Sequence, residues 1–177
     1  MLIILLQLVT CVFITSCPIS TSGYSIRVSE ANTLLNDRPI IGVLSQELSY
    51  SLRKHFPDDY NSYIAASYVK FIEGAGARVV PIWIGKNKSY YEDILSKING
   101  VLWPGGSTFF NQSNGYADAG YTIYNISRRM NKNGDYFPIF GICLGFELLT
   151  YIAAHRVEHR IDCSSLNQPL PLEFVSG

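Results

Sequence analysis

The architecture of this chain follows from one stretch, Phe137-Pro-Ile-Phe-Gly-Ile-Cys-Leu-Gly-Phe-Glu147, and from the apolar run that continues to Ala154. The stretch predicts a short buried strand over 137–142, a tight corner at Cys143 and a helix that starts near Leu144. Strands that lead into helices are the units of parallel α/β sheets. We therefore expect an α/β fold with this cysteine at the end of one strand.

Two glycines, Gly141 and Gly145, flank Cys143 symmetrically, which gives the Gly-x-Nuc-x-Gly pattern of a nucleophile elbow. Glycine lacks a Cβ, so it allows the close backbone approach that a strained strand-to-helix corner needs. The positive end of the helix dipole favours a thiolate, and the Leu144 N–H is free to stabilise an oxyanion. We predict that Cys143 is a nucleophile. The alternative is a buried structural cysteine between two packing glycines.

A second stretch, Gly100-Val-Leu-Trp-Pro-Gly-Gly-Ser107, predicts a buried strand that ends in a Pro-Gly-Gly turn. Ligands bind beyond the carboxyl ends of strands in an open parallel sheet, so we expect this turn on the same edge as Cys143. We assign Gly106 as the second backbone oxyanion donor beside Leu144, and Gly105 as a substrate contact. The alternative is an ordinary strand-terminating turn.

The rest of the chain alternates between strands and helices, and it shows no internal repeat or low-complexity linker. Nearly continuous apolar strands separated by helices predict a parallel sheet that is covered on both faces. The segment 48–61 is predicted as a loop. The predicted strands are 40–44, 79–84 and 101–103, and the predicted helices are 63–73, 90–97 and 116–130.

The N-terminus has the layout of a secretory signal peptide, which we place over 1–23, with an N-terminal extension over 24–37. An uncharged apolar core over 2–14 is followed by small and polar residues, and it is short for a membrane span. The alternatives are a buried helix or an anchor.

Cleavage of the signal peptide would leave Cys143 and Cys163 as the cysteines of the mature chain. The two could form a disulfide, but a cysteine that acts as a nucleophile cannot be in a disulfide.

Three Asn-x-Ser sequons agree with secretion, at Asn87, Asn111 and Asn125, on expected loops or exposed helix positions. Formal charge is balanced, with 14 basic and 14 acidic residues, so nothing indicates a nucleic-acid surface or an anionic membrane patch. Beyond the N-terminus no apolar run is long enough to span a bilayer. We expect a secreted, lysosomal or vacuolar protein without membrane attachment after cleavage.

The histidines are weak candidates for the base that a cysteine nucleophile needs. His155 and His159 have the i, i+4 spacing of one helix face, but the charged residues between them favour a solvated helix end. Such a pair could also bind a metal, but the HExxH arrangement and a third ligand are missing. His55 is expected in an exposed loop. We predict no metal and no organic cofactor.

The chain resembles gamma-glutamyl hydrolase, the secreted and lysosomal folylpolyglutamate hydrolase of the class I glutamine-amidotransferase-like superfamily. Glu147, two positions after the second glycine, matches this group, whereas the similar glutaminases usually carry Gln there. The resemblance rests on Arg38-Pro-Ile-Ile-Gly-Val-Leu44, Tyr63-Ile-Ala-Ala-Ser-Tyr-Val-Lys70, Gly74-Ala-Gly-Ala-Arg-Val-Val-Pro81, Asn99-Gly-Val-Leu-Trp-Pro-Gly-Gly-Ser107, Asp135-Tyr-Phe-Pro-Ile-Phe-Gly-Ile-Cys-Leu-Gly-Phe-Glu147 and Pro169-Leu-Pro-Leu-Glu-Phe174.

The resemblance implies a flavodoxin-like three-layer sandwich with a mainly parallel central sheet, of which 38–177 would be the N-terminal portion. It implies a Cys143 thioester mechanism on poly-γ-glutamyl folates, with Glu147 near the substrate and a homodimer as one expected assembly. The family's downstream His-Pro-Glu-like segment has no match in this sequence. We therefore expect a truncated domain that is inactive alone and poorly soluble, with an exposed sheet edge. The alternatives are a non-catalytic secreted glycoprotein and an amidotransferase-like glutaminase.

Overall fold

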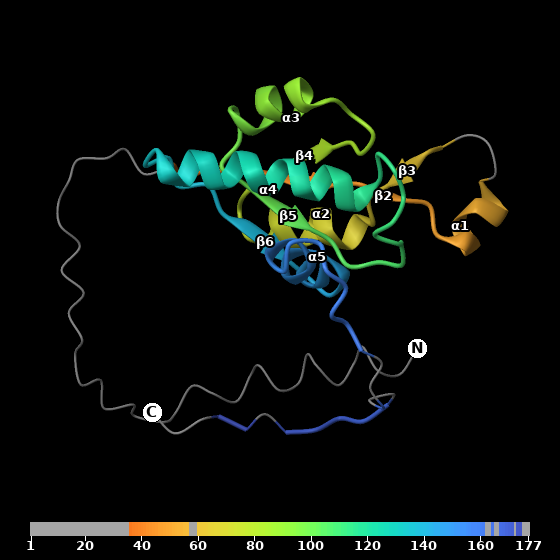
Figure 1. The fold of residues 1–177 in the computed structure, drawn as a ribbon. Helices are drawn as coiled ribbons and strands as arrows, with labels where there is room; N and C mark the ends of the chain where they lie inside the picture. Colours follow the sequence, from red (N-terminus) through yellow and green to blue (C-terminus); the bar gives the residue numbers. More distant parts are fainter. Residues whose placement is uncertain (1–35, 57–59, 162–163, 165–166, 172, 175–177) are drawn as a thin grey trace, which may run out of the picture. The chain divides into compact units, whose positions relative to one another are not determined.

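A four-stranded parallel sheet forms the centre of the computed structural model, which describes residues 36–56, 60–161, 164, 167–171 and 173–174 (Figure 1). The strand order is β4-β1-β5-β6. The predicted signal peptide and Cys163 lie outside the described residues. The strands are β1 (Ile40–Leu44), β4 (Arg78–Ile82), β5 (Gly100–Trp103) and β6 (Ile139–Gly141).

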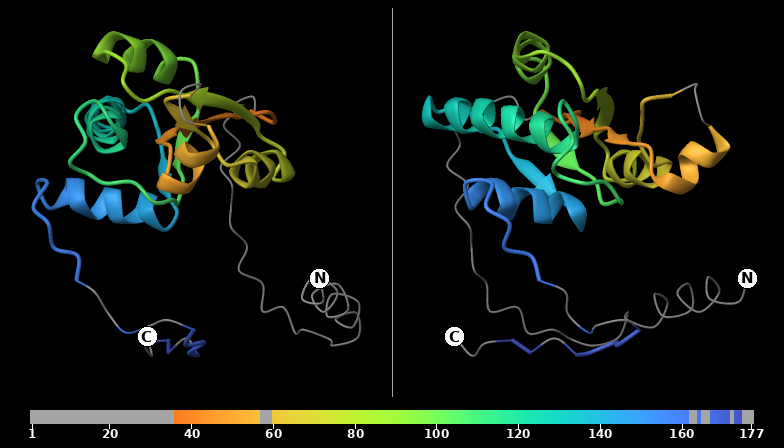
Figure 2. Two further views of the ribbon diagram at one scale, coloured as in Figure 1. Left: turned by 90° about the vertical axis from the view of Figure 1, so that its right-hand side faces the viewer. Right: turned by 45° about the vertical axis from the view of Figure 1, so that its right-hand side comes forward.

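Helices cover both faces of this sheet, as Figure 2 shows. One face packs α3 (Lys88–Leu95), α4 (Tyr116–Lys132) and α5 (Leu144–Ala153) into a core centred on Trp103, which is fully buried. The other face carries α2 (Ala66–Gly74), whose buried Ile72 packs in a smaller cluster with strand residues. The predicted α/β fold with a mainly parallel, two-sided sheet is confirmed.

The largest departure from the sequence-based expectation is the segment 48–61, which was predicted as a loop. It contains a short helix, α1 (Tyr50–His55), because the Ser49 hydroxyl caps it by accepting a hydrogen bond from the Leu52 N–H. A two-residue antiparallel pair, β2 (Gln46–Glu47) with β3 (Ser62–Tyr63), brackets this helix. The prediction was wrong because it gave weight to polar composition rather than to the capping serine.

Smaller corrections concern the first predicted helix. Residue Tyr63 belongs to β3, and α2 starts at Ala66. The Phe71 side chain on this helix is 58% exposed. No helix among the described residues has the length and apolar character needed to cross a membrane.

Strand β6 pairs with β5 and lies at the edge of the described sheet. Beside it, an apolar groove of about 210 Å³ runs between α2 and β6, with Phe71 and Phe140 on its walls. Phe140, like Phe71, is 58% exposed. This edge and groove are the features on which the prediction of poor solubility depends, and that prediction remains open to test.

Candidate active site

Cys143 occupies a strained corner between β6 and α5. Its φ of 52° and ψ of −115° lie in a region that residues with a Cβ rarely adopt, and the residue is the N-cap of α5. The thiol is exposed and is not in a disulfide. The sequence-based alternative, a buried structural cysteine, does not fit this exposure.

The two flanking glycines are required by close backbone approach. A Cβ on Gly145 would lie 2.1 Å from the carbonyl oxygen of Trp103, at the end of β5. A Cβ on Gly141 would lie 2.6 Å from the carbonyl oxygen of Gly145. Both distances are far below van der Waals contact, so the strand, the corner and the first turn of α5 fit together only with glycine at these positions.

The turn after β5 and the corner after β6 lie side by side. A Cβ on Gly105 would lie 2.9 Å from Cβ of Cys143 and 3.3 Å from the carbonyl oxygen of Ile142. The Ile142 N–H donates to the Trp103 carbonyl at 3.0 Å, which extends the β5–β6 pairing up to the corner. The parallel register therefore brings the Pro-Gly-Gly turn against the cysteine.

Three side chains hold the Pro104–Gly105 peptide in one orientation. Its carbonyl oxygen accepts hydrogen bonds from Gln46 Nε2 and from the Tyr116 hydroxyl, each at 2.9 Å. Its N–H donates to the Tyr68 hydroxyl at 2.9 Å. The Gly105 N–H is therefore occupied, which leaves the next amide, that of Gly106, as the candidate donor from this turn.

Leu144 and Gly106 are the two amides that the sequence assigned to an oxyanion hole. No acceptor for either N–H is found within the described part of the chain. Leu144 is the first residue of α5, so its amide has no partner within the helix. Gly106 lies against Gln46, whose Oε1 would be 1.9 Å from an added Cβ. These assignments remain predictions.

Glu47 fixes the far end of the same loop. Its buried carboxylate accepts hydrogen bonds from the Tyr116 N–H at 2.8 Å and from the Thr108 hydroxyl at 2.7 Å. Helix α4 has no side-chain cap of its own at Gly115, and a Cβ there would lie 2.0 Å from Glu47 Oε1. A carboxylate from β2 thus caps α4, where the helix dipole also favours negative charge.

Burial is the main electrostatic influence on Tyr116. It raises the pKa of the Tyr116 hydroxyl well above its ordinary value, against the smaller opposing effect of the hydrogen bond with Gln46. Nearby Tyr68, Glu47 and Cys143 raise the pKa further. Tyr116 therefore keeps its proton and remains a donor to the Pro104 carbonyl.

Sequence reasoning missed Gln46, Glu47, Tyr68 and Tyr116. Each contacts a residue at least 12 positions away in the chain. The one available signal was the position of Gln46 and Glu47, which are polar residues that follow the carboxyl end of β1 closely. That position is where an open parallel sheet places its ligand-binding residues.

Glu147, the fourth residue of α5, is engaged by a charged partner. Its N–H donates to the Cys143 carbonyl at 3.0 Å, and its carboxylate accepts from Arg160 at 3.0 Å. Arg160 also lies 4.3 Å above the Phe110 ring and pairs with Glu158. Hydrogen bonding from Arg160 lowers the pKa of Glu158 to about 2. A substrate role for Glu147 remains a prediction.

None of the three histidines of this chain is hydrogen-bonded to Cys143. His55 Nδ1 contacts the Ser51 carbonyl within α1, and His159 Nδ1 contacts the Val157 carbonyl. His155 follows the end of α5 with a φ of 57°, so His155 and His159 do not share a helix face as their spacing had indicated. The helix ends at Ala153, before either of them.

The three sequon asparagines are exposed. Asn87 is also the N-cap of α3, where its Oδ1 accepts from the Tyr90 N–H at 3.0 Å. Asn111 lies in the loop before α4, whereas Asn125 lies within that helix and donates to the Tyr121 carbonyl. Within the described residues, no cluster of three histidine, cysteine or acidic side chains could hold a metal ion.

Comparison with known proteins matches residues 39–165 to a family described as Peptidase C26. The chain is 47% identical over 140 residues to gamma-glutamyl hydrolase from Bos taurus, covering 79% of this chain and 42% of that protein. The corresponding Homo sapiens protein is 39% identical over 140 residues, with the same coverage. The Mus musculus protein is 40% identical over 162 residues, covering 91% of this chain and 48% of that protein. The chain thus spans less than half the length of these relatives.

Proposed function

The chain belongs to the peptidase C26 family, and on that premise we propose that Cys143 is the nucleophile of a hydrolase that cleaves γ-glutamyl bonds. The substrate class is folylpoly-γ-glutamate, in line with the gamma-glutamyl hydrolases that the chain resembles. The observation that carries the proposal is the exposed thiol at a strained strand-to-helix corner beside a glycine turn.

The chemistry is acyl transfer through a thioester. The Cys143 thiolate attacks the carbonyl carbon of the γ-amide, and the N–H groups of Leu144 and Gly106 stabilise the resulting oxyanion. The C–N bond then breaks, the amine leaves with a proton, and a thioester remains on Cys143. Water hydrolyses that thioester, which releases the γ-glutamyl acid and restores the thiol.

Both proton transfers are normally assisted by an imidazole, and this assistance contributes about 10²–10⁴-fold in rate. None of the three histidines of this chain is hydrogen-bonded to Cys143. We therefore expect the chain by itself to form the thioester slowly and to hydrolyse it more slowly still. The acylated form should accumulate.

Mass spectrometry of the purified chain after incubation with an activated γ-glutamyl amide, such as γ-glutamyl-p-nitroanilide, tests this chemistry. The expected result is one γ-glutamyl adduct on Cys143, released by hydroxylamine and absent from Cys143→Ala. Absence of the adduct from correctly folded protein, or equal labelling of Cys163, would refute the proposal. Absence of the adduct would favour the alternative of a non-catalytic glycoprotein. The absence of a hydrogen bond between Cys143 and any of the three histidines also supports that alternative.

A glutaminase is distinguished in the same assay, because its cysteine would be acylated by free glutamine and ammonia would be released.

We further propose that the protein enters the secretory pathway and carries N-glycans at Asn87, Asn111 and Asn125, with the extracellular space, lysosome or vacuole as its destination. The exposure of the three asparagine side chains supports their glycosylation. N-terminal sequencing and glycosidase treatment of the product secreted from eukaryotic cells test the pathway. Light scattering tests the expected homodimer.

A further inference from the structure

Gln46 is a buried polar residue that takes no part in the mechanism proposed above. It is only 2% exposed, and it lies on β2, two positions beyond the end of β1. A buried amide side chain is costly unless its polar atoms are hydrogen-bonded, so the groups that it contacts indicate what it holds in place.

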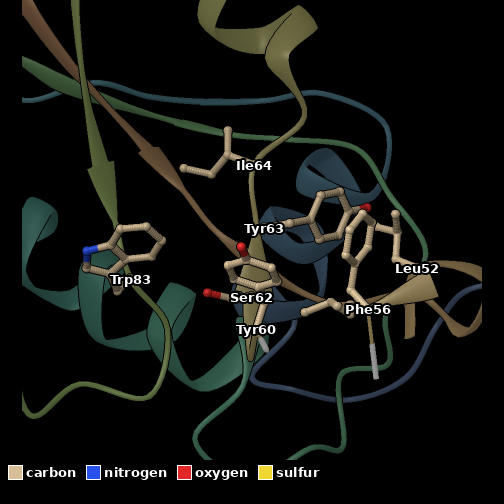
Figure 3. Close-up of a pocket in the computed structure, with 8 residues that line it drawn as sticks. Leu52, Phe56, Tyr60, Ser62, Tyr63, Ile64 and Trp83 are labelled. Atoms are coloured by element: carbon tan, nitrogen blue, oxygen red, sulfur yellow. The ribbon is translucent and has the colours of Figure 1, made fainter. Parts of the chain in front are cut away.

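The backbone on which Gln46 lies is fixed. The residue pairs with Tyr63 across the β2–β3 ladder, and the N–H of the preceding Ser45 donates to a carbonyl of β4 at 2.8 Å. Figure 3 shows Tyr63 between Trp83 and Phe56 on the wall of a cavity of about 420 Å³. Gln46 does not line that cavity, and its side chain extends to the Pro-Gly-Gly turn after β5. The amide group thus reaches the turn from a rigid element.

The Gln46 side chain contacts the residues on both sides of Gly105. Its Nε2 donates to the Pro104 carbonyl at 2.9 Å, and the Tyr116 hydroxyl donates to the same oxygen. On the other side, the three heavy atoms nearest to the Cβ position that Gly106 lacks all belong to Gln46. Oε1 is the nearest of them, followed by Cδ at 2.9 Å and Nε2 at 3.2 Å. The planar amide group therefore spans the turn from Pro104 to Gly106.

This contact explains why residue 106 is a glycine. Neither Gly105 nor Gly106 has a φ in the left-handed region that by itself favours glycine. A methyl group at Gly106 would occupy the space of the Gln46 amide. A methyl group at Gly105 would instead meet Tyr68 and Cys143. The two glycines therefore make room for different neighbours, and the second makes room for Gln46.

Two consecutive glycines form a very flexible backbone, so the direction of the Gly106 N–H has to be set by its surroundings. A peptide unit is planar, and the Pro104–Gly105 unit has both its carbonyl and its N–H hydrogen-bonded. Because Gly106 also lies against Gln46, the Gly105–Gly106 peptide that carries the N–H is constrained at both ends. An oxyanion donor is effective when it is held in place before the reaction.

We propose that Gln46 is the positioning residue for the Gly106 oxyanion donor. It acts through the Pro104 carbonyl and through Gly106, without contact with the substrate. The inference rests on the proposed function, because an oxyanion forms only if Cys143 attacks a carbonyl carbon. Loss of the Gln46 amide should therefore slow the attack on a carbonyl and leave the intrinsic reactivity of the thiol unchanged.

Two reactions of Cys143 separate these effects. Acylation by γ-glutamyl-p-nitroanilide passes through an oxyanion. Alkylation by iodoacetamide forms an S–C bond as the C–I bond breaks and iodide leaves, so no oxyanion forms. Mass spectrometry of tryptic peptides gives both rates at Cys143 in the full chain.

Gln46→Met keeps the length of the side chain and removes the donor. We expect acylation of Cys143 to be roughly 100-fold slower in this variant, because a displaced oxyanion donor is lost to the transition state, and alkylation to be unchanged. Tyr116 still donates to the Pro104 carbonyl, so the fold is retained. Gln46→Glu keeps the shape and places a carboxylate against that carbonyl, so acylation should fall at least as far.

A control and a double-mutant cycle separate positioning from a general loss of structure. Ser127→Ala removes a buried hydroxyl that donates to the Phe137 carbonyl at 2.9 Å, and it should leave the ratio of the two rates unchanged. Gly106→Ala displaces the Gln46 amide, so it should also slow acylation roughly 100-fold. Adding Gln46→Ala to Gly106→Ala should cause no further loss, because both changes act on one contact.

The possible outcomes distinguish the positioning role from the proposed function. Acylation that is unchanged in Gln46→Met, that falls together with alkylation, or that falls about 10⁴-fold in the double variant overturns the positioning role, even if Cys143 is the nucleophile. If the wild type is not acylated, the hydrolase proposal fails, and ¹⁵N relaxation of the Gly106 amide decides the positioning role. An amide that is rigid in the wild type and mobile in Gln46→Met supports the role, and equal mobility in the two proteins overturns it.

Discussion

Gly145→Ala places a methyl group where the structure has no room for it. The new Cβ would lie 2.1 Å from the Trp103 carbonyl oxygen, 2.7 Å from its carbonyl carbon and 2.9 Å from its Cβ. Trp103 is fully buried at the end of β5, and the contacted atoms are backbone or the root of its side chain. None of them can move aside by a change of rotamer. Helix α5 and strand β5 must instead separate by about 1 Å.

The size of the effect follows from this separation. Overpacking of a well-packed core destabilises the folded protein by about 1–3 kcal/mol, and a clash with rigid backbone belongs at the upper end. We therefore expect the free energy of unfolding to fall by about 3 kcal/mol. The shift also moves the Leu144 amide and the Cys143 thiol relative to the Gly105 turn. A misplacement of about 1 Å in a reacting group can reduce the rate about 100-fold, so acylation of Cys143 should fall by that order.

Gly74→Ala is the matched control. A Cβ on Gly74 has no heavy atom within 4 Å, and the residue is the last one in α2. The same chemical change should therefore stabilise the protein by about 0.5–1 kcal/mol, because alanine has less backbone freedom to lose than glycine in a helix.

Urea unfolding followed by circular dichroism gives the stability of both variants, and mass spectrometry gives the rate of Cys143 acylation. The steric explanation of the elbow predicts opposite signs of the stability change for Gly145→Ala and Gly74→Ala. The reasoning is wrong if the free energy of unfolding of Gly145→Ala lies within about 0.5 kcal/mol of the wild-type value, which is the spread of neutral surface changes, and if Cys143 is acylated at the same rate in both proteins.

Three further changes test other parts of the structure. Glu47→Ala removes the acceptor for the Tyr116 N–H and the Thr108 hydroxyl, so urea unfolding should show a free energy of unfolding lower by about 2–3 kcal/mol. Glu47→Gln should show a smaller decrease, and equal decreases for the two variants would show that these hydrogen bonds do not stabilise the fold. Asn87→Ala removes the N-cap of α3 and should lower the free energy of unfolding by about 1 kcal/mol in the same assay. Asn87→Asp keeps the cap and removes only the glycan site, so equal stability of the two variants would contradict the capping role. Glu158 has a folded pKa of about 2, lowered from 4.5 by Arg160, so its contact is fully formed above pH 4.5 and is lost as the pH falls through about 2. Carboxylate NMR should show this midpoint and its return towards 4.5 in Arg160→Ala, and a midpoint near 4.5 in the wild type would contradict the pairing.

Local sequence patterns predicted the sheet well because its strands are short, apolar and bounded by turn residues. The strand 40–44 has the predicted bounds, and the corner at Cys143 was predicted from its two glycines, whose steric role is local. The clamp on the Pro104–Gly105 peptide could not be predicted in this way. It joins Gln46, Tyr68 and Tyr116, which come from three separate elements, and their meeting depends on strand order and register. Glu47 likewise caps a helix 69 residues away, and no local pattern records such a contact.

The most direct test of the central claim is the number of glutamate molecules that each purified, signal-cleaved chain releases from pteroyl-di-γ-glutamate, with Cys143→Ala as the control. A nucleophile without an imidazole partner predicts at most about one glutamate per chain, dependent on Cys143, followed by a plateau. Sustained release over many turnovers that still depends on Cys143 would show that a base acts at this site. Release that persists in Cys143→Ala would contradict the assignment of the nucleophile itself.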